Sequence, residues 1–521
     1  MLRFSRLCYA ITVLALFSVA QGQSDSGTGS GGRIILPDGL TLRPHAYAHL
    51  ESGQIESGNV KNDDFQANGS KYGIDHVWTE DGDIEFGFAS TYRERFDMDV
   101  SIGAKLYFSY PIFFSHDKNT KYLRTDPYFD QAYAKYSWGP VESSWLSAQV
   151  GYFKFKYNPD VRNLGEYMFR TGTYPIYFDM SFDAPFQRLL GIHLQDNFLD
   201  NSLKIDWLLA SATLFPTMNW SAAVLANYDV AGLHFLNIGA GVDFADLLDV
   251  YTKSAFPSYG GDPTSLTSTT YNNRYVGANG DTNFYTFQGT KVMGRLSIDP
   301  KTFFKWRFLG ENDLKLYAEA DLIGVQNYPD SGLNPAGQKV ITAPSYDSIL
   351  QRIPVSVGFN FPTYPLFAYG VAPELLLWKL QGKYDVVPQI STTLGCLVAG
   401  AALSWLQERF HINSQLDVLN LEMEYFGAKY YNDASNVNGK GDAPLPYSVN
   451  IWGDPGAPRK SDVKWSVYAK KSFLNGHFSV AAQVGLDHLR LSTPAYDYEY
   501  WNEMLVTSND WWWVLKTSWM F

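Results

Sequence analysis

Along most of the chain, hydrophobic side chains occupy every second position. Between residues 98 and 110, for example, Val100, Ile102 and Ala104 alternate with Ser101 and Gly103. A period of two is the pattern of a β-strand, whose successive side chains point to opposite faces of the sheet. The runs span about 9–14 residues, the length of a tilted membrane-spanning strand, whereas strands of soluble domains are typically about 5–6 residues long. The pattern predicts an all-β protein with transmembrane strands.

Sixteen such runs can be placed after residue 40. Short connections (94–97, 139–143, 197–202, 229–232 and 474–476) alternate with mostly longer ones (51–83, 111–127, 156–185, 245–284, 429–462 and 491–510), although 214–218 is short and 299–311 long for its place. This alternation is typical of a transmembrane barrel with periplasmic turns and external loops. The predicted strands lie near 41–50, 84–93, 98–110, 128–138, 144–155, 186–196, 203–213, 219–228, 233–244, 285–298, 312–325, 349–361, 415–428, 463–473, 477–490 and 511–521.

The final strand runs to the last residue. Trp513, Leu515, Thr517, Trp519 and Phe521 share one face of it. An open apolar edge invites aggregation, whereas in a closed barrel the last strand pairs with the first. The aromatic-ended strand resembles the C-terminal signature of bacterial outer-membrane β-barrel proteins of the porin type. The resemblance implies a closed antiparallel barrel, surroundings of outer-membrane lipid and lipopolysaccharide, and a barrel-assembly machinery that reads Trp519 and Phe521.

One segment interrupts the rhythm. Residues 362–414 form a long excursion where a short turn is expected. An extra strand hairpin would raise the strand count to eighteen, so we expect 16–18 strands. A periplasmic insertion with an apolar helix is the alternative, because Ala and Leu dominate Leu394 to Leu406. We favour the hairpin slightly.

The N-terminus predicts export. Arg3 and Arg6 precede an apolar run from Leu7 to Val19 and small residues suited to cleavage. These are the parts of a secretory signal peptide, which we place at 1–22. A Gly/Ser-rich periplasmic linker follows at 23–40, and the barrel occupies 41–521. Only Cys396 remains after cleavage, so no intramolecular disulfide is expected.

Composition supports a barrel and limits the partners. Aromatic residues make up 16% of the chain, yet the mean hydropathy is −0.20. Lipid-facing and lumen-facing residues cancel in this way in a barrel, and aromatics serve as its interfacial girdles. The net charge of −12 argues against nucleic acid as a partner. Homo-oligomerisation is left open, and a secreted polysaccharide-binding β-protein is the alternative on composition alone.

Strand parity predicts which charged residues face the lumen. A charge facing lipid costs up to about 2–4 kcal/mol at the midplane, so the charges should share the inward face. Basic and acidic residues are nearly balanced there, which predicts weak ion selectivity. The predicted pore-lining residues are Glu85, Asp99, Lys105, Lys204, Asp206, Lys291, Arg295, Lys315, Glu319, Asp321, Arg352, Glu422, Glu424, Lys464, Lys470, Asp487 and Lys516.

The chain carries no motif for catalysis, so we expect no enzyme activity, cofactor or metal. It lacks G-x-S-x-G, H-E-x-x-H, C-x-x-C and Walker-type sequences. His193 is the one histidine that would suit a hydrolytic site on a barrel, and a solvated lumen histidine is the favoured interpretation. Aspartates around Asp126–Asp130 and at Asp160 have oxygen ligands suited to calcium, but ordinary turn chemistry explains them.

The interpretation that joins these observations is a passive outer-membrane porin for small polar solutes or ions. Neutral saccharides are one substrate class, because Tyr and Trp faces offer stacking surfaces. The segment Lys154 to Pro175, or 245–284, is expected to fold inward as a constriction. The alternative function is a structural, surface-attachment or export-associated barrel whose long loops bind a partner.

Overall fold

In the computed structural model the described part of the chain comprises the wall strands and several connections. It covers residues 34–35, 39–57, 77–108, 123–140, 144–169, 178–181, 184–211, 220–230, 233, 235–248, 274–276, 282–284, 289–303, 309–322, 331–333, 339–341, 350, 353–365, 367–368, 397–398, 400–402, 404–405, 415–427, 461–486 and 510–521. The predicted signal peptide 1–22 and linker residues 23–33 lie outside these ranges.

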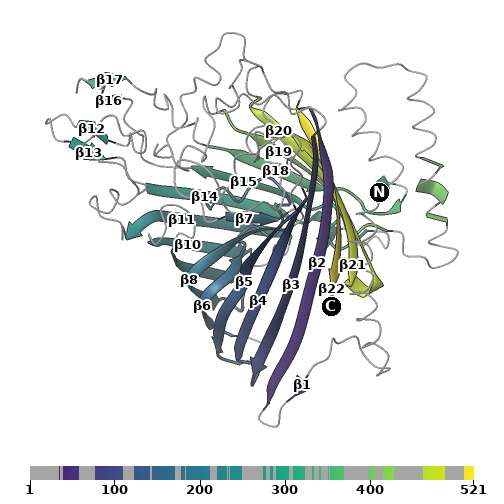
Figure 1. Ribbon diagram of the computed structural model, residues 1–521, viewed down its shortest axis with the longest axis horizontal. Helices are drawn as coiled ribbons and strands as arrows, with labels where there is room; N and C mark the ends of the chain where they lie inside the picture. The colour runs from purple at the N-terminus through teal and green to yellow at the C-terminus, as the bar shows by residue number, and fades with distance from the viewer. Residues whose placement is uncertain are drawn as a thin grey trace.

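The wall is a closed antiparallel barrel of sixteen strands (Figure 1). Each of the sixteen predicted runs corresponds to one wall strand, so the expected fold is confirmed. The strands are β2 (Leu40–Ser57), β3 (Val77–Tyr92), β4 (Phe96–Phe108), β5 (Leu123–Trp138), β6 (Leu146–Phe155), β8 (Ala184–Phe198), β9 (Leu203–Ser211), β10 (Trp220–Asp229), β11 (Leu236–Leu248), β14 (Gly289–Ile298), β15 (Leu316–Leu322), β18 (Val355–Asn360), β19 (Val418–Tyr425), β20 (Val463–Phe473), β21 (Phe478–Leu486) and β22 (Trp511–Met520).

Six short strands accompany the wall. β1 (Ile34–Ile35) pairs with the start of β2, and β7 (Phe178–Ser181) pairs with the start of β8. Two small hairpins, β12 (Arg274–Val276) with β13 (Thr282–Phe284) and β16 (Ser331–Leu333) with β17 (Lys339–Ile341), lie together at one end of the barrel (Figure 1). None of the six is counted as a separate strand of the barrel wall.

Closure joins the first and last wall strands. β2 and β22 are antiparallel from the pair Tyr47 and Met520 to the pair Ser57 and Trp511. Phe521 continues the ladder, because its N–H donates to the Ala46 carbonyl at 2.9 Å and its carbonyl accepts from the Ala46 N–H at 3.1 Å. The terminal strand therefore has no open edge, as its apolar pattern predicted.

The excursion at 362–414 adds no strand to the barrel wall. β18 pairs directly with β19 from Val355 and Tyr425 to Asn360 and Asn420. The ends of the excursion are tied together, since the Leu416 N–H donates to the Thr363 carbonyl at 3.3 Å. Its described residues between 397 and 405 are helical. The slight preference for a wall hairpin is therefore wrong, and the Ala and Leu content indicated the helical alternative correctly for these residues.

Helical content is small. No helix in the described ranges has the length and apolar character needed to cross a membrane.

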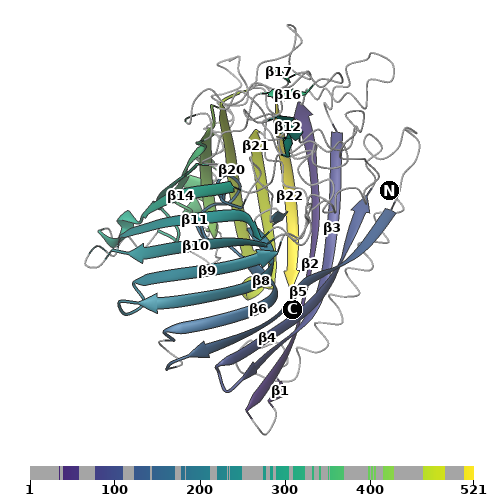
Figure 2. The ribbon, with the colours of Figure 1, turned by 90° about the vertical axis from the view of Figure 1, so that its left-hand side faces the viewer.

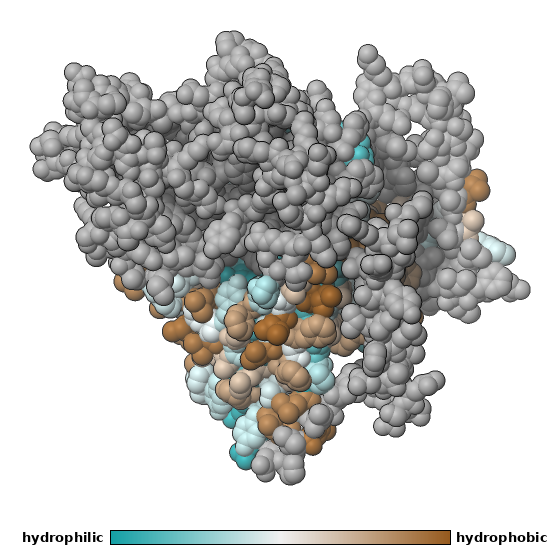
Figure 3. Space-filling view, in the orientation of Figure 1, coloured by the Kyte–Doolittle hydropathy of each residue, from teal (hydrophilic) through white to brown (hydrophobic). Residues whose placement is uncertain are grey.

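The outer face of the wall is apolar. On β3, Phe86 and Phe88 are 49% and 63% exposed, whereas Glu85 between them is 9% exposed. Hydrophobic side chains gather over the strands in the lower half of Figure 3. Alternation of this kind directs apolar side chains to lipid and polar ones to the interior.

β5 and β6 separate along part of their length, and this separation is here called the parting. The two strands pair only from Ala132 and Tyr152 to Trp138 and Leu146, although β5 begins at Leu123. Beyond Tyr152, residues Phe153–Phe155 of β6 pair with β8 alone. Figure 2 shows the change of direction, with β6 to β14 running across the view while β2 and β22 stand nearly upright. The chain after β6 thereby turns into the barrel.

Candidate functional site

The segment 156–169, here called the interior loop, crosses the barrel. It leaves β6, the fifth wall strand, and hydrogen-bonds to β15 and β19, the eleventh and thirteenth. β6 and β19 are eight strands apart in a ring of sixteen, so the loop reaches the opposite side of the wall. The inward-folding segment expected between Lys154 and Pro175 is thus located within its described part, to residue 169. The other expected segment, 245–284, lies mostly outside the described ranges.

Glu319 on β15 holds one end of the interior loop. Its carboxylate accepts hydrogen bonds from the Tyr157 hydroxyl at 2.6 Å, the Asn158 side-chain amide at 2.6 Å and the Tyr167 N–H at 3.1 Å. Glu319 is 1% exposed. A buried carboxylate needs several donors to offset its desolvation, and the loop supplies them.

Glu422 on β19 holds the middle of the loop. Successive backbone N–H groups of Arg162, Asn163 and Leu164 donate to it at 2.5, 2.7 and 2.8 Å. The Tyr317 hydroxyl donates at 2.6 Å from β15. Consecutive N–H groups form a concave anion site, and here a wall side chain occupies it.

Two further carboxylates complete the attachment. Glu424 accepts from the Tyr167 hydroxyl at 2.5 Å and lies 3.5 Å from the Lys464 ammonium. Glu166 belongs to the loop itself and accepts from the Asn158 N–H at 2.5 Å and the Gln187 amide at 2.6 Å. The loop is therefore fixed to the wall on both sides of the barrel.

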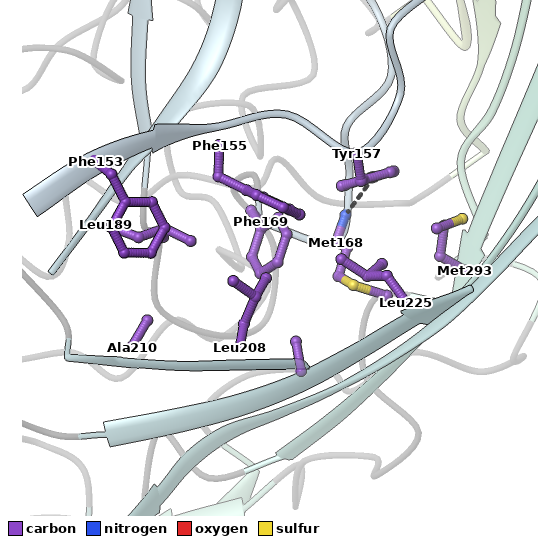
Figure 4. Packing of buried hydrophobic residues seen from close by; sticks show 11 residues of the cluster. Phe153, Phe155, Tyr157, Met168, Phe169, Leu189, Leu208, Ala210, Leu225 and Met293 are labelled. Atoms are coloured by element: carbon purple, nitrogen blue, oxygen red, sulfur yellow. Dashed lines mark hydrogen bonds between the residues drawn. The ribbon is translucent and has the colours of Figure 1, made fainter. Parts of the chain in front are cut away.

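The underside of the loop is an apolar core inside the barrel (Figure 4). Met168 and Phe169 from the loop pack on side chains from the inner faces of β6, β8, β9, β10 and β14. The Phe169 ring lies 6.1 Å from Phe155 and 5.7 Å from Tyr157. The cluster contains Phe153, Phe155, Tyr157, Met168, Phe169, Leu189, Leu208, Ala210, Ala223, Leu225 and Met293. This half of the interior is closed to water by packing.

A polar cluster fills the parting between β5 and β6. Asp130 accepts from Lys154 at 2.7 Å and from Arg188 at 2.6 Å, joining β5 to β6 and β8. The Tyr128 hydroxyl donates to Glu85 at 2.8 Å and also to Asp83. A bulge in the β4–β5 register leaves Asp130 without a cross-strand partner on β4, and the Ser101 hydroxyl donates to its carboxylate at 3.1 Å.

The predicted pore-lining residues divide by environment. Glu319, Glu422 and Glu424 lie under the interior loop and are 1–2% exposed. Lys291 (0% exposed) and Asp321 (1%) are buried in the wall beneath the loop, while Glu85 belongs to the parting cluster and Lys105 lies over the ring of Tyr128, 5.5 Å from its centroid.

The others are distributed along the wall. Lys516 lies 3.3 Å from Glu51 across the closing seam, and Lys464 pairs with Glu424. Asp99 contacts His45 at 3.3 Å, Asp206 contacts His193 at 2.8 Å, and Arg295 donates to Asn227. Lys315 pairs with Asp160 at 2.9 Å, Lys470 is half-buried and Lys204 is exposed. Arg352 and Asp487 lie outside the described ranges.

The sequence analysis missed most of the residues that attach the interior loop to the wall and most of those in the polar cluster between β5 and β6. Tyr157, Asn158, Tyr167, Tyr128 and Arg188 were not predicted to act at the site. Parity assigns a side chain to a face, but it does not show which partner a loop brings to it. The one available signal was the Asn158-Pro159-Asp160 turn, which is more ordered than a loose loop.

His193 has a structural role. Its ring contacts Asp206 at 2.8 Å and stacks near Phe153 and Phe155. No serine is among the contacts described for it. Two of the aspartates considered for calcium likewise have cationic partners, Lys154 and Arg188 for Asp130 and Lys315 for Asp160. Across the described residues, no group of three or more His, Cys, Asp and Glu side chains is arranged to hold a metal.

Comparisons with known proteins return distant structural likenesses. No protein-family model and no curated protein matches the chain. Solved structures of similar shape include a mutant of Rh. blastica porin (6% identity, TM-score 0.37, covering 92% of this chain and 100% of the other). Another is OprB of Pseudomonas putida (8%, 0.39, 92% and 94%). A third is the outer membrane channel DcaP of Acinetobacter baumannii (10%, 0.37, 95% and 100%).

The fold is a closed antiparallel β-barrel. Its closed wall of sixteen strands and apolar outer face define it independently of these distant likenesses. At such identities and TM-scores, the likeness carries no information about solute or mechanism. The function of this barrel has to be argued from its own interior.

Proposed function

We propose that this barrel is an outer-membrane channel for passive diffusion of small polar solutes or ions. The observation that supports this most is the closed sixteen-stranded wall with a polar inner face crossed by a fixed loop. A wall of this size encloses a lumen too wide for wall side chains alone to fill. The interior loop occupies part of that width, and the proposed path for solutes runs along its other face.

The path proposed here is narrow. Under the loop the interior is an apolar core, and even polar wall residues such as Lys464 and Lys516 are 1% exposed. Solutes would therefore pass one at a time beside the loop, selected mainly by size. Saccharides remain within the proposal on composition alone.

Purified protein in planar lipid bilayers tests the channel. We expect discrete, roughly ohmic current steps, with small conductance because the loop narrows the lumen. Correct folding is checked by faster migration of the unboiled sample on an SDS gel. A folded preparation that never conducts would instead favour the attachment or export-associated alternative, in which long loops bind a partner.

Location in an outer membrane is tested through the last strand. Phe521→Asp should lower the amount of assembled barrel, because the terminal aromatic is lost and a charge enters the closing ladder. Thr517→Ala, on the same face of β22, is the matched control. Equal accumulation of both variants in the membrane fraction would contradict the assembly signal at Trp519 and Phe521.

A further inference from the structure

Two cations on the interior loop form no ion pair by direct contact with a carboxylate among the described residues. The Lys156 ammonium donates to the Val161 carbonyl at 2.7 Å, its one hydrogen bond in the described structure. The Arg162 side chain has a buried Nε without an acceptor, although the Arg162 N–H is bound to Glu422. Both residues are half-buried. Among the described residues neither side chain forms an ion pair, so their charges are not compensated by direct contact.

The acidic groups near them are turned away from the path. Glu166, Glu319, Glu422 and Glu424 are 0–2% exposed and their oxygens accept hydrogen bonds from the loop and the wall. In the wall beneath the loop, Asp243 and Asp321 lie near Lys291, and all three are at most 1% exposed. The negative charge is therefore mostly under the loop.

In two ion pairs near the interior loop, the cation is also more exposed than the carboxylate. The side chain of Lys315 is 24% exposed and that of its partner Asp160 is 7% exposed. For Lys154 and Asp130 the fractions are 28% and 2%. In each pair the ammonium is on the accessible side and the carboxylate is deeper. A solute beside the loop thus meets the cationic members first.

We propose that Lys156 and Arg162, with Lys315 beside them, form an anion-binding site on the accessible face of the interior loop. The proposal rests on the channel function and names its preferred solutes, small anions carrying phosphate or carboxylate groups. A guanidinium with free donors binds such oxyanions by charge-assisted hydrogen bonds. Fixed cations along a narrow path also raise the local concentration of anions.

This differs from the weak selectivity expected from the balanced count of wall charges. A count weighs each charge equally, whereas a passing ion interacts most with the charges that remain near it and accessible to water. Backbone N–H groups and tyrosine hydroxyls compensate the carboxylates at the loop. Among the described residues, Lys156 and Arg162 have no such direct contact with an opposite charge, so we expect the position of the charges to matter more than their number.

The test is the reversal potential of the channel in a KCl gradient. We expect chloride to permeate better than potassium, and inorganic phosphate to reduce the chloride current. Lys156→Gln with Arg162→Gln should lower the chloride-to-potassium permeability ratio roughly fivefold. Arg162→Lys should retain most of the preference, because it keeps the charge. Lys301→Gln, on the turn after β14, removes a lysine far from the loop and should change nothing.

The outcomes separate this inference from the channel function. A conducting barrel with a ratio near one, or a ratio that the double variant leaves unchanged, would overturn the anion site while the channel proposal stands. If the folded protein never conducts, the channel proposal fails. The site is then judged by whether inorganic phosphate raises the thermal transition of wild type but not of the double variant, and the absence of any shift overturns it.

Discussion

The two halves of the barrel interior are built by different means. The inner faces of β6 to β14 carry an apolar cluster, and the interior loop packs on it with Met168 and Phe169. From β22 through β2 to β5 the inner wall carries ion pairs, such as Glu51 with Lys516 and Asp130 with Lys154 and Arg188. The first region contains an apolar core like that of a soluble protein, whereas the second is joined mainly by ion pairs.

The difference shows how the barrel holds the interior loop in place. Apolar packing is non-directional and excludes water, so it gives the loop a broad base on one side. On the opposite side, Glu319 and Glu422 place particular backbone atoms by hydrogen bonds. Apolar burial stabilises the attachment of the interior loop, and the hydrogen bonds to the carboxylates determine where the loop lies. Each contribution can be removed separately.

Releasing the loop from the carboxylates should have the largest effect. Glu319→Ala with Glu422→Ala removes acceptors for three and four hydrogen bonds respectively. Each such bond to a charged group contributes about 1.5–3 kcal/mol. We expect the loop to detach and single-channel conductance to rise about twofold or more, as the lumen widens. Glu311→Ala, on a turn, is the control, and unchanged conductance in the double variant would mean that the packed half alone holds the interior loop.

Truncating the apolar base should come next. Phe169 is 2% exposed, and Phe169→Ala should destabilise the fold by about 3–5 kcal/mol through lost burial and a cavity. The readout is the temperature at which the unboiled, fast-migrating band disappears. Phe129→Ala is the matched change on the lipid side, where the ring is 63% exposed. Equal shifts for the two variants would show that the interior core does not differ from the outer belt.

The charged half should respond less. Asp130→Asn keeps the shape but removes the charge that accepts from Lys154 and Arg188. We expect a loss of about 1–3 kcal/mol, seen in the same thermal assay, with no increase in conductance because the loop stays attached. Asp200→Asn, on a turn, serves as control. If Asp130→Asn raised the conductance as much as Glu319→Ala with Glu422→Ala, the polar cluster between β5 and β6 would also position the interior loop.

A pH change should give the smallest effect. Burial lowers the pKa of Lys156 to about 8, with Arg162 adding to the decrease while Glu166, Glu422 and Asp160 oppose it. Burial, together with Glu319, raises the pKa of Glu166 to about 8. Between pH 7 and 9 the lysine loses its positive charge and the glutamate gains a negative one. Chloride preference should therefore fall as the pH rises, and Lys156→Gln should weaken this dependence. A preference that increases with pH would contradict the assignment.

Much of the wall was readable from the sequence. The alternation of Val100, Ile102 and Ala104 with polar residues reports a local property, because a strand has a period of two whatever its partners are. The aromatic end at Phe521 likewise predicted closure, since an apolar strand must be paired. At 362–414, where the sequence left a hairpin and a helical insertion open, the pairing of β18 with β19 decided against a hairpin in the wall.

The interior was settled only by the tertiary structure. Parity indicated the inward face for Glu319, Glu422 and Glu424, and hydrogen bonds to Tyr157, Asn158 and Tyr167 place them under a loop. These contacts join residues more than a hundred positions apart, and no local period encodes them. Whether an inward carboxylate faces water or anchors a loop depends on closure of the ring, which brings β6 opposite β19. The sequence by itself determined the faces of the strands, and the fold determined what each face meets.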